Sequence, residues 1–174
     1  MHPIEATTTR VVRIGGLTKD ELLTQLQAAG VRLNEAGQTL FADERFTTAP
    51  ISSAVEVVET AVAGLGLPDG ATFARIVEQA AGRGLTLCPL ELGPHLRLQF
   101  TDQPEGHVGQ PPTRHRAPPG SLTVASAPLA DDEDTPKGFY LRRIEGALWL
   151  RGYRAPPEHH YWPEDRFAFR RANV

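Results

Sequence analysis

Residues 138–153 read GFYLRRIEGALWLRGY, and this stretch constrains the fold more than any other part of the chain. Two runs with apolar residues at every second position flank Glu145 and Gly146, which suit the two-residue turn of a β-hairpin. A slip of one residue would mix apolar and polar side chains on both faces, so the pattern favours a single register. The predicted cross-strand pairs are Ile144 with Ala147, Arg142 with Trp149, Leu141 with Leu150, and Tyr140 with Arg151.

The predicted hairpin has one apolar face and one unusual face. The apolar face, which we expect to lie in the core, comprises Phe139, Leu141, Leu148 and Leu150. The other face, where a purely structural hairpin would carry Thr, Ser, Lys or Glu, comprises Tyr140, Arg142, Trp149, Arg151 and Tyr153. Three interpretations of this face remain open: arginine stems stacked on rings within the chain, a protein-binding patch, or a platform for the bases of single-stranded nucleic acid.

Three further segments of the second half have strand patterns, at residues 96–100, 121–126 and 166–171. Apolar and polar residues alternate in the first and the last of them, so each of these strands should have one buried face. Turn-forming residues separate all of the predicted strands. The expected fold class is α+β, with an antiparallel sheet of about five strands and N-terminal helices packed on one side of it.

The first half of the chain, residues 11–88, carries clear helix signals. Thr18 and Glu21 have the spacing of a capping box, and Gly30 is placed to end the helix that they begin. A second, weaker helix is predicted from Asn34 onward. A helix-turn-helix that reads DNA is disfavoured, because this second helix has few basic residues and several acidic ones.

A similar capped helix recurs at residues 69–88, in register with the first over about 20 residues without a gap. This recurrence indicates either a duplicated unit or the similarity that any two capped helices ending in Gly would show. Two strands are also predicted in this half, at residues 11–14 and 53–65, and we expect them to pair.

The 174 residues are expected to form a single domain, 1–174, with a helical part at 11–88 and a β-rich part at 89–174. Residues 102–120 are rich in Pro and Gly and predict a flexible loop. The formal net charge is −3, but residues 137–174 carry eight Lys and Arg against four Asp and Glu. This asymmetry indicates either an anionic partner or an acidic loop that ends just before the basic segment.

The sequence contains no recognised catalytic or cofactor motif. Phosphate-binding glycine loops, His-Glu-x-x-His, Cys-x-x-Cys and Gly-x-Ser-x-Gly are all missing. Cys88 is the only cysteine, which agrees with a reducing cytoplasm, and it is expected to be buried. No apolar run reaches the roughly 20 residues of a membrane span, and the first residues lack a secretory pattern. We therefore expect a cytoplasmic protein with no cofactor, no metal and no membrane contact.

Three segments carry a resemblance: GGLTKDELLTQLQAAGVRLNEAGQTLFADERF, LTLCPLELGPHLRLQFTDQPEG and GFYLRRIEGALWLRGYRA. Together they resemble a family of short bacterial proteins that are mostly uncharacterised and sometimes labelled helicase. Relative to that family, residues 107–119 look like an insertion. A helicase motor needs a phosphate-binding loop, which this chain lacks. The resemblance thus implies at most an accessory to nucleic-acid metabolism, and no site residues carry over from it.

The sequence therefore predicts a non-enzymatic cytoplasmic binding module. The expected binding residues are Tyr140, Arg142, Trp149, Arg151, Tyr153 and Arg154, helped by Arg170 and Arg171. A protein partner or a homodimer is slightly favoured over single-stranded nucleic acid, because residues 1–136 are acidic overall. The alternative is a small-molecule enzyme or sensor with a helix–sheet cleft, where Arg142 and Arg151 hold an anionic ligand and Tyr140 or Trp149 stacks on it.

Overall fold

The computed structural model describes residues 7–106 and 120–173. The α-helices of these ranges are α1 (Lys19–Ala28), α2 (Glu35–Ala42), α3 (Phe73–Ala81) and α4 (Leu92–Gln99). The longer strands are β1 (Thr8–Ile14), β3 (Ser53–Ala61), β6 (Leu122–Val124), β7 (Gly138–Ile144), β8 (Ala147–Tyr153) and β10 (Arg166–Arg171). The strands of two residues are β2 (Arg32–Leu33), β4 (Ala71–Thr72), β5 (Leu85–Thr86) and β9 (His160–Tyr161).

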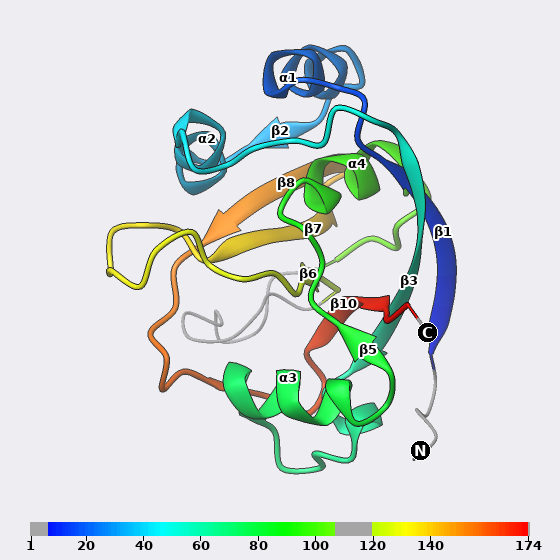
Figure 1. The fold of residues 1–174 in the computed structure, drawn as a ribbon, viewed down its shortest axis with the longest axis vertical. Coiled ribbons are helices and arrows are strands. Elements are labelled where there is room, and N and C mark those ends of the chain that lie inside the picture. Colours follow the sequence, from blue (N-terminus) through cyan, green and yellow to red (C-terminus); the bar gives the residue numbers. More distant parts are fainter. Residues whose placement is uncertain (1–6, 107–119, 174) are drawn as a thin grey trace.

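The central element is a mixed eight-stranded sheet with the order β1-β3-β10-β6-β7-β8-β2, to which β5 adds by pairing with β10 (Figure 1). The pairs β10–β6 and β2–β8 are parallel. The fold class is α+β, but the expected antiparallel sheet of about five strands is wrong. The sheet is larger than expected because the N-terminal strands β1 and β3 join it through β10. It also includes β2 and β5, which are too short to show a periodicity in the sequence.

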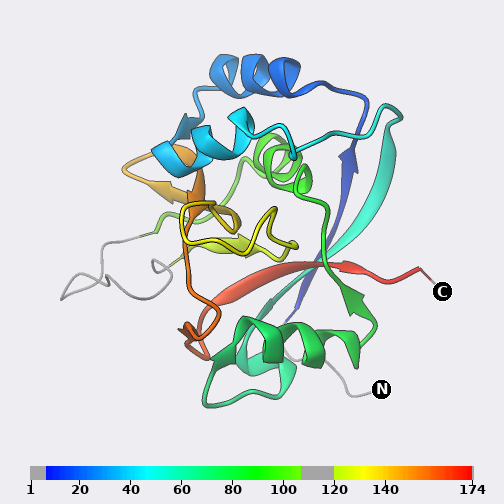
Figure 2. The same cartoon turned by 60° about the vertical axis from the view of Figure 1, so that its left-hand side comes forward.

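The sheet separates two hydrophobic cores. In β3, Val57 faces one core and Val58 the other, and in β10 the same holds for Ala168 and Phe167. Helices α1, α2 and α4 cover the first core, whereas α3 covers the second (Figure 2). The expectation of helices on one side only is therefore wrong, because β3 and β10 are buried on both faces and each face needs its own cover.

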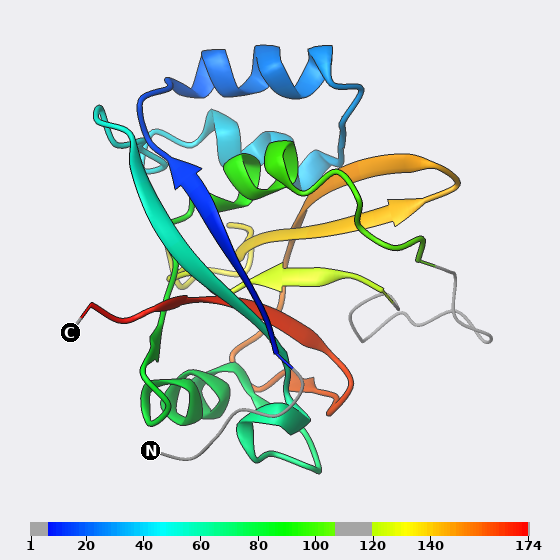
Figure 3. The same cartoon turned by 90° about the vertical axis from the view of Figure 1, so that its right-hand side faces the viewer.

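The β7–β8 hairpin has the predicted register, with all four expected cross-strand pairs confirmed. Glu145 and Gly146 have φ of 50° and 76°, the positive values that a type I′ turn requires. Phe139, Leu141 and Leu150 are fully buried in the first core. Helix α4 packs against β7 and β8 from that side (Figure 3). Three of the four residues of the apolar face thus lie in the core as predicted, whereas Leu148, near the turn, is only half-buried and is not part of the core.

The N-terminal predictions are largely confirmed. The Thr18 side chain caps α1 in a complete capping box with Glu21, and Asn34 caps α2 through the Gly37 N–H. Strands β1 and β3 pair antiparallel, as expected. The two similar helical units, α1 and α3, lie on opposite faces of the sheet, so they do not share a core, and their duplication stays a prediction.

Residues 96–100 do not form the predicted strand but the end of α4 and its C-cap. Leu92 and Leu96 are both fully buried, which is the four-residue spacing of a helix face. Pro94 lies in the first turn, where proline is tolerated. His95 therefore lies on a helix. Of the loop predicted at 102–120, residues 107–119 lie outside the described residues.

Candidate functional site

Arginines and aromatic rings gather on the face of the hairpin that points away from α4. Four of the predicted residues lie there, and β2 contributes a fifth, Arg32, which is in register with Trp149 on β8. All are half-buried except Arg32, which is exposed. We call this set the arginine face: Arg32, Tyr140, Arg142, Trp149 and Arg151.

Arg151 is stacked and hydrogen-bonded within the arginine face. Its guanidinium lies 4.9 Å from the ring centre of Trp149 and 5.9 Å from that of Tyr140. Its Nε also donates a hydrogen bond of 2.8 Å to the Tyr140 hydroxyl. The Arg32 guanidinium lies 5.9 Å from the Trp149 ring centre. Cation–π stacking within the chain is thus present, but stacking occupies the ring faces and leaves most of the in-plane N–H groups available.

The positive charges of the arginine face have no ion-pair partner in the part of the chain that the structure describes. None of the described carboxylates pairs with Arg32, Arg142 or Arg151, whereas the adjacent Arg143 pairs with Glu105 at 3.3 Å. The Nε of Arg142 is buried and finds no hydrogen-bond partner among the described residues. Burial lowers the pKa of Arg142, and the charge of Arg151 adds to the effect.

A further cation supports the hairpin from the opposite side. Arg97 of α4 is fully buried, and its Nη1 donates to the Gln103 side chain at 2.6 Å and to the Trp149 carbonyl at 3.3 Å. Its Nη2 donates to the Phe100 carbonyl. Burial, reinforced by nearby Arg143, lowers the pKa of Arg97 to about 10. Helix α4 therefore holds the backbone under the arginine face and keeps another positive charge close to it.

Two predicted residues lie beyond the arginine face. The Tyr153 ring is 6.3 Å from that of Tyr140, but its hydroxyl is paired with the Tyr161 hydroxyl, and burial raises the pKa of Tyr153 well above its ordinary value. Arg154 is exposed, and its Nε donates to the Asp134 carbonyl at 3.0 Å. Tyr153 thus borders the site, whereas Arg154 is held by the acidic loop.

Arg170 and Arg171, expected to help the site, do not reach it. They lie at the end of β10 that pairs with β5, and Arg171 forms an ion pair of 3.3 Å with Glu56. Sequence reasoning missed Arg32 instead. The only signal for it was the apolar-x-apolar pattern around Arg32, which indicates a strand but does not reveal that this strand pairs with β8.

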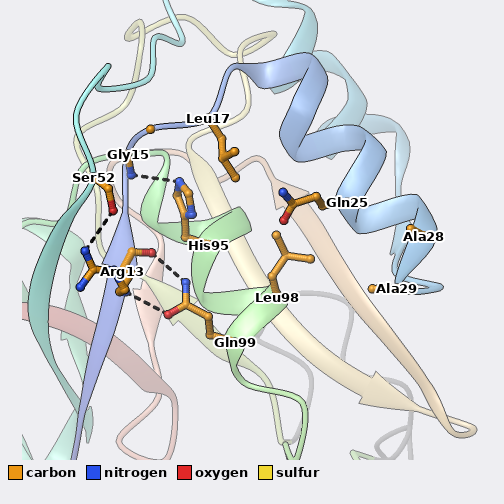
Figure 4. A pocket seen from close by; sticks show the side chains of 11 residues that line it. Arg13, Gly15, Leu17, Gln25, Ala28, Ala29, Ser52, His95, Leu98 and Gln99 are labelled. Atoms are coloured by element: carbon orange, nitrogen blue, oxygen red, sulfur yellow. Dashed lines mark hydrogen bonds between the residues drawn. The ribbon is translucent and has the colours of Figure 1, made fainter.

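The structure has a helix–sheet cleft, but Arg142 and Arg151 do not line it, as a small-molecule enzyme or sensor of the kind considered above would require. A cavity of about 780 Å³ lies between α1, α4 and the end of β1 (Figure 4). Arg142 and Arg151 are not among its lining residues, since they lie on the other side of the hairpin. Arg13 does line the cavity, but its guanidinium turns toward Ser52, with 3.4 Å between Nη2 and Oγ (Figure 4).

His95 is the buried polar side chain of this cavity. Its Nε2 accepts a hydrogen bond of 3.1 Å from the Gly15 N–H, which places the ring proton on Nδ1. Burial lowers the pKa of His95, although the Glu91 carboxylate at 3.5 Å opposes the shift. Gln99, one turn later, pairs with both backbone groups of Arg13. His95 and Gln99 therefore provide hydrogen-bond partners for backbone groups along the outer edge of β1 and just after its end, which is a structural role.

The described residues offer no metal site, no reactive thiol and no membrane-spanning helix. Among residues 7–106 and 120–173, no cluster of three or more His, Cys, Asp or Glu side chains is placed to hold a metal ion. Cys88 is buried, and burial raises the pKa of its thiol to about 12, which makes it a poor nucleophile. None of the described helices has the length and apolar character that crossing a bilayer requires.

The chain was compared with protein-family models, with curated proteins and with solved structures, and none of the three comparisons gives a match. The resemblance to the helicase-labelled family therefore stays an expectation. Geometry and charge alone must support a function for the arginine face.

Proposed function

We propose that this protein is a cytoplasmic binding module whose arginine face binds an acidic segment of a partner protein. The observation that carries the proposal is the group of three arginines, Arg32, Arg142 and Arg151, on one face without a carboxylate partner among the described residues. Besides burial, the charge of Arg151 contributes to the lowered pKa of Arg142, so these like charges repel one another, and an anionic partner would relieve that repulsion.

The geometry favours carboxylates over nucleic-acid bases. Arg151 and Arg32 already cover the Trp149 ring, so an open ring face for base stacking is limited. The guanidinium edges remain, and their paired N–H groups match a carboxylate in a bidentate manner. The hydrogen bond from Arg151 to Tyr140 also orders that side chain before binding, which lowers the entropy cost. Trp, Tyr and Arg are the residue types that dominate protein-binding hot spots.

Fluorescence anisotropy of a labelled oligoglutamate peptide tests this function. We expect the double variant Arg142→Gln/Arg151→Gln to bind at least ~10-fold more weakly than the wild type, because two of the three arginines of the arginine face are lost. The matched control is Arg45→Gln/Arg75→Gln, which removes the same charge from two arginines that pair with Asp43 and Glu78 outside the face.

The control should bind like the wild type. An equal loss in both double variants would show that only net charge matters, which would contradict a specific face. A labelled oligothymidylate is titrated in parallel. If it binds more tightly than the peptide at matched salt and loses affinity in the Arg142→Gln/Arg151→Gln variant, the partner is a nucleic acid and the proposed partner class is wrong.

A further inference from the structure

A second cavity lies between the end of β8 and the start of α3. Its volume is about 200 Å³, below the range of about 300–1,000 Å³ that pockets for drug-sized ligands occupy. It is therefore the size of a single side chain. Rings and prolines form much of its wall, with Phe73 and Ala74 from α3, Tyr153 from β8, Tyr161 from β9, and Pro128 and Pro156 from loops.

This cavity continues the arginine face along β8. Tyr153 forms part of its wall, and the Tyr153 ring lies 6.3 Å from the ring of Tyr140. Tyr140 in turn accepts the hydrogen bond from Arg151. A chain bound across the arginine face would therefore reach the mouth of the cavity within a few residues, because Tyr153 follows Arg151 by one alternation of the strand.

One polar group in the cavity is left without a partner. Ser126 is only 2% exposed, and its Oγ has no hydrogen-bond partner among the described residues. The neighbouring Gly138 keeps the space beside it open, since a Cβ at that position would lie 3.0 Å from the Ser126 Oγ and 3.4 Å from the Tyr153 ring. Buried hydroxyls are normally paired, so this one is suited to a polar atom of an incoming group.

We propose that this cavity receives one aromatic side chain of the acidic segment that binds the arginine face. The recognised sequence would then be an acidic run next to an aromatic residue. An aromatic ring suits the Tyr and Phe walls, and the N–H of Trp or the O–H of Tyr can donate to the Ser126 hydroxyl. This inference rests on the proposed function, which supplies the acidic run.

The charges around the cavity agree with a ring inside it and carboxylates outside it. Asp131 belongs to the wall and would repel a bound carboxylate. The ammonium of Lys137, also in the wall, already donates to the carbonyls of Ala130 and Asp132. The carboxylates of the segment should therefore lie toward Arg142 and Arg151. Its aromatic side chain should lie in the cavity between Tyr153 and α3.

The test compares two labelled peptides by fluorescence anisotropy. Both carry the same run of glutamates followed by Gly-x-Gly, with x as Ala in one and Trp in the other. We expect the Trp peptide to bind the wild type at least ~10-fold more tightly than the Ala peptide. In Ala74→Trp, which fills the cavity from the exposed surface of α3, the ratio of the two affinities should fall to about one.

The matched control is Ala81→Trp, an exposed position on the same helix outside the cavity wall, which should keep the ratio of the wild type. Circular dichroism and urea unfolding establish that both variants fold. If the two peptides bind the wild type equally and both depend on Arg142 and Arg151, the proposed function stands and this inference is overturned. If Ala74→Trp still prefers the Trp peptide over the Ala peptide, the aromatic side chain does not bind in this cavity. If neither peptide binds, or only an oligothymidylate does, both proposals fail.

Discussion

The guanidinium of Arg97 lies directly under the backbone of Trp149, to whose carbonyl it donates a hydrogen bond of 3.3 Å. Arg97 belongs to α4 in the first core, whereas the Trp149 side chain points to the opposite face and stacks with Arg151. The core helix thus holds the strand position that carries the centre of the arginine face. Stability of the core and geometry of the arginine face should therefore be coupled through this contact.

Replacing Arg97 should destabilise the fold and disturb Trp149. In Arg97→Met the Gln103 side chain and the Phe100 and Trp149 carbonyls lose their donor, so we expect unfolding free energy to fall by about 2–4 kcal/mol in urea titrations. Arg97→Lys keeps the charge but replaces the guanidinium, which has several N–H donors in one plane, with a single ammonium group. Its unfolding free energy should therefore fall less than that of Arg97→Met. A Met variant as stable as the wild type would mean that this buried charge costs as much as its hydrogen bonds contribute.

Two glycines with similar backbone angles should differ sharply in their tolerance of alanine. Gly15 and Gly30 have φ of 79° and 74°. A Cβ on Gly15 would approach the Ile51 carbonyl oxygen within 2.3 Å, whereas one on Gly30 meets nothing within 4 Å. Gly30→Ala should cost only about 1–2 kcal/mol for the left-handed conformation, and Gly15→Ala at least about 3 kcal/mol. Equal losses in chemical denaturation would refute the close approach at Gly15.

Stability should fall as the solution becomes acidic, in part because of His95. Burial keeps the pKa of His95 in the folded protein below its ordinary value of 6.5. As the pH falls below about 6.5, the unfolded chain takes up a proton at this residue before the folded protein does, so the folded state loses stability until its own pKa is reached. The wild type should therefore lose more unfolding free energy than His95→Gln between about pH 7.5 and pH 5.5.

Denaturant unfolding at each pH measures this difference. The His95→Gln variant lacks the titrating ring. The change of its unfolding free energy with pH therefore comes from all other titratable groups. Parallel pH profiles of wild type and variant would show that His95 does not contribute.

The Cys88 thiol should be unreactive in the folded protein. It is buried, and burial raises its pKa to about 12, so almost no thiolate forms at neutral pH. We expect Ellman's reagent to label it slowly in native buffer and fully in urea. Rapid stoichiometric labelling of the native state would indicate that the surrounding core opens readily.

Patterns that are local in sequence predicted the correct structure. The hairpin register follows from strict alternation on both sides of Glu145 and Gly146, and the structure has the same pairs. The capping box at Thr18 and Glu21 likewise marks the start of α1. In these places turn chemistry, capping and burial all favour one arrangement, so no tertiary information was needed.

Features that depend on tertiary pairing escaped prediction. The sequence at 96–100 alternates like a strand, yet Leu96 is buried together with Leu92 on one helix face. Strand β2 is only two residues long, and its parallel pairing with β8, which brings Arg32 to Trp149, joins segments far apart in the chain. The second core beneath α3 depends on β10 being covered on both faces, which alternation at Phe167 and Phe169 does not reveal.

The most direct test of the arginine face uses Trp149 itself as the reporter. Trp162→Phe leaves Trp149 as the only tryptophan, and its emission is followed while an unlabelled oligoglutamate peptide is added. If the peptide binds the arginine face, Trp149 emission should change saturably, and the change should weaken as salt is raised and be lost in Arg142→Gln/Arg151→Gln. If Trp149 emission stays constant while anisotropy shows that the labelled peptide is bound, the peptide binds elsewhere on the molecule and the arginine face is not the binding site.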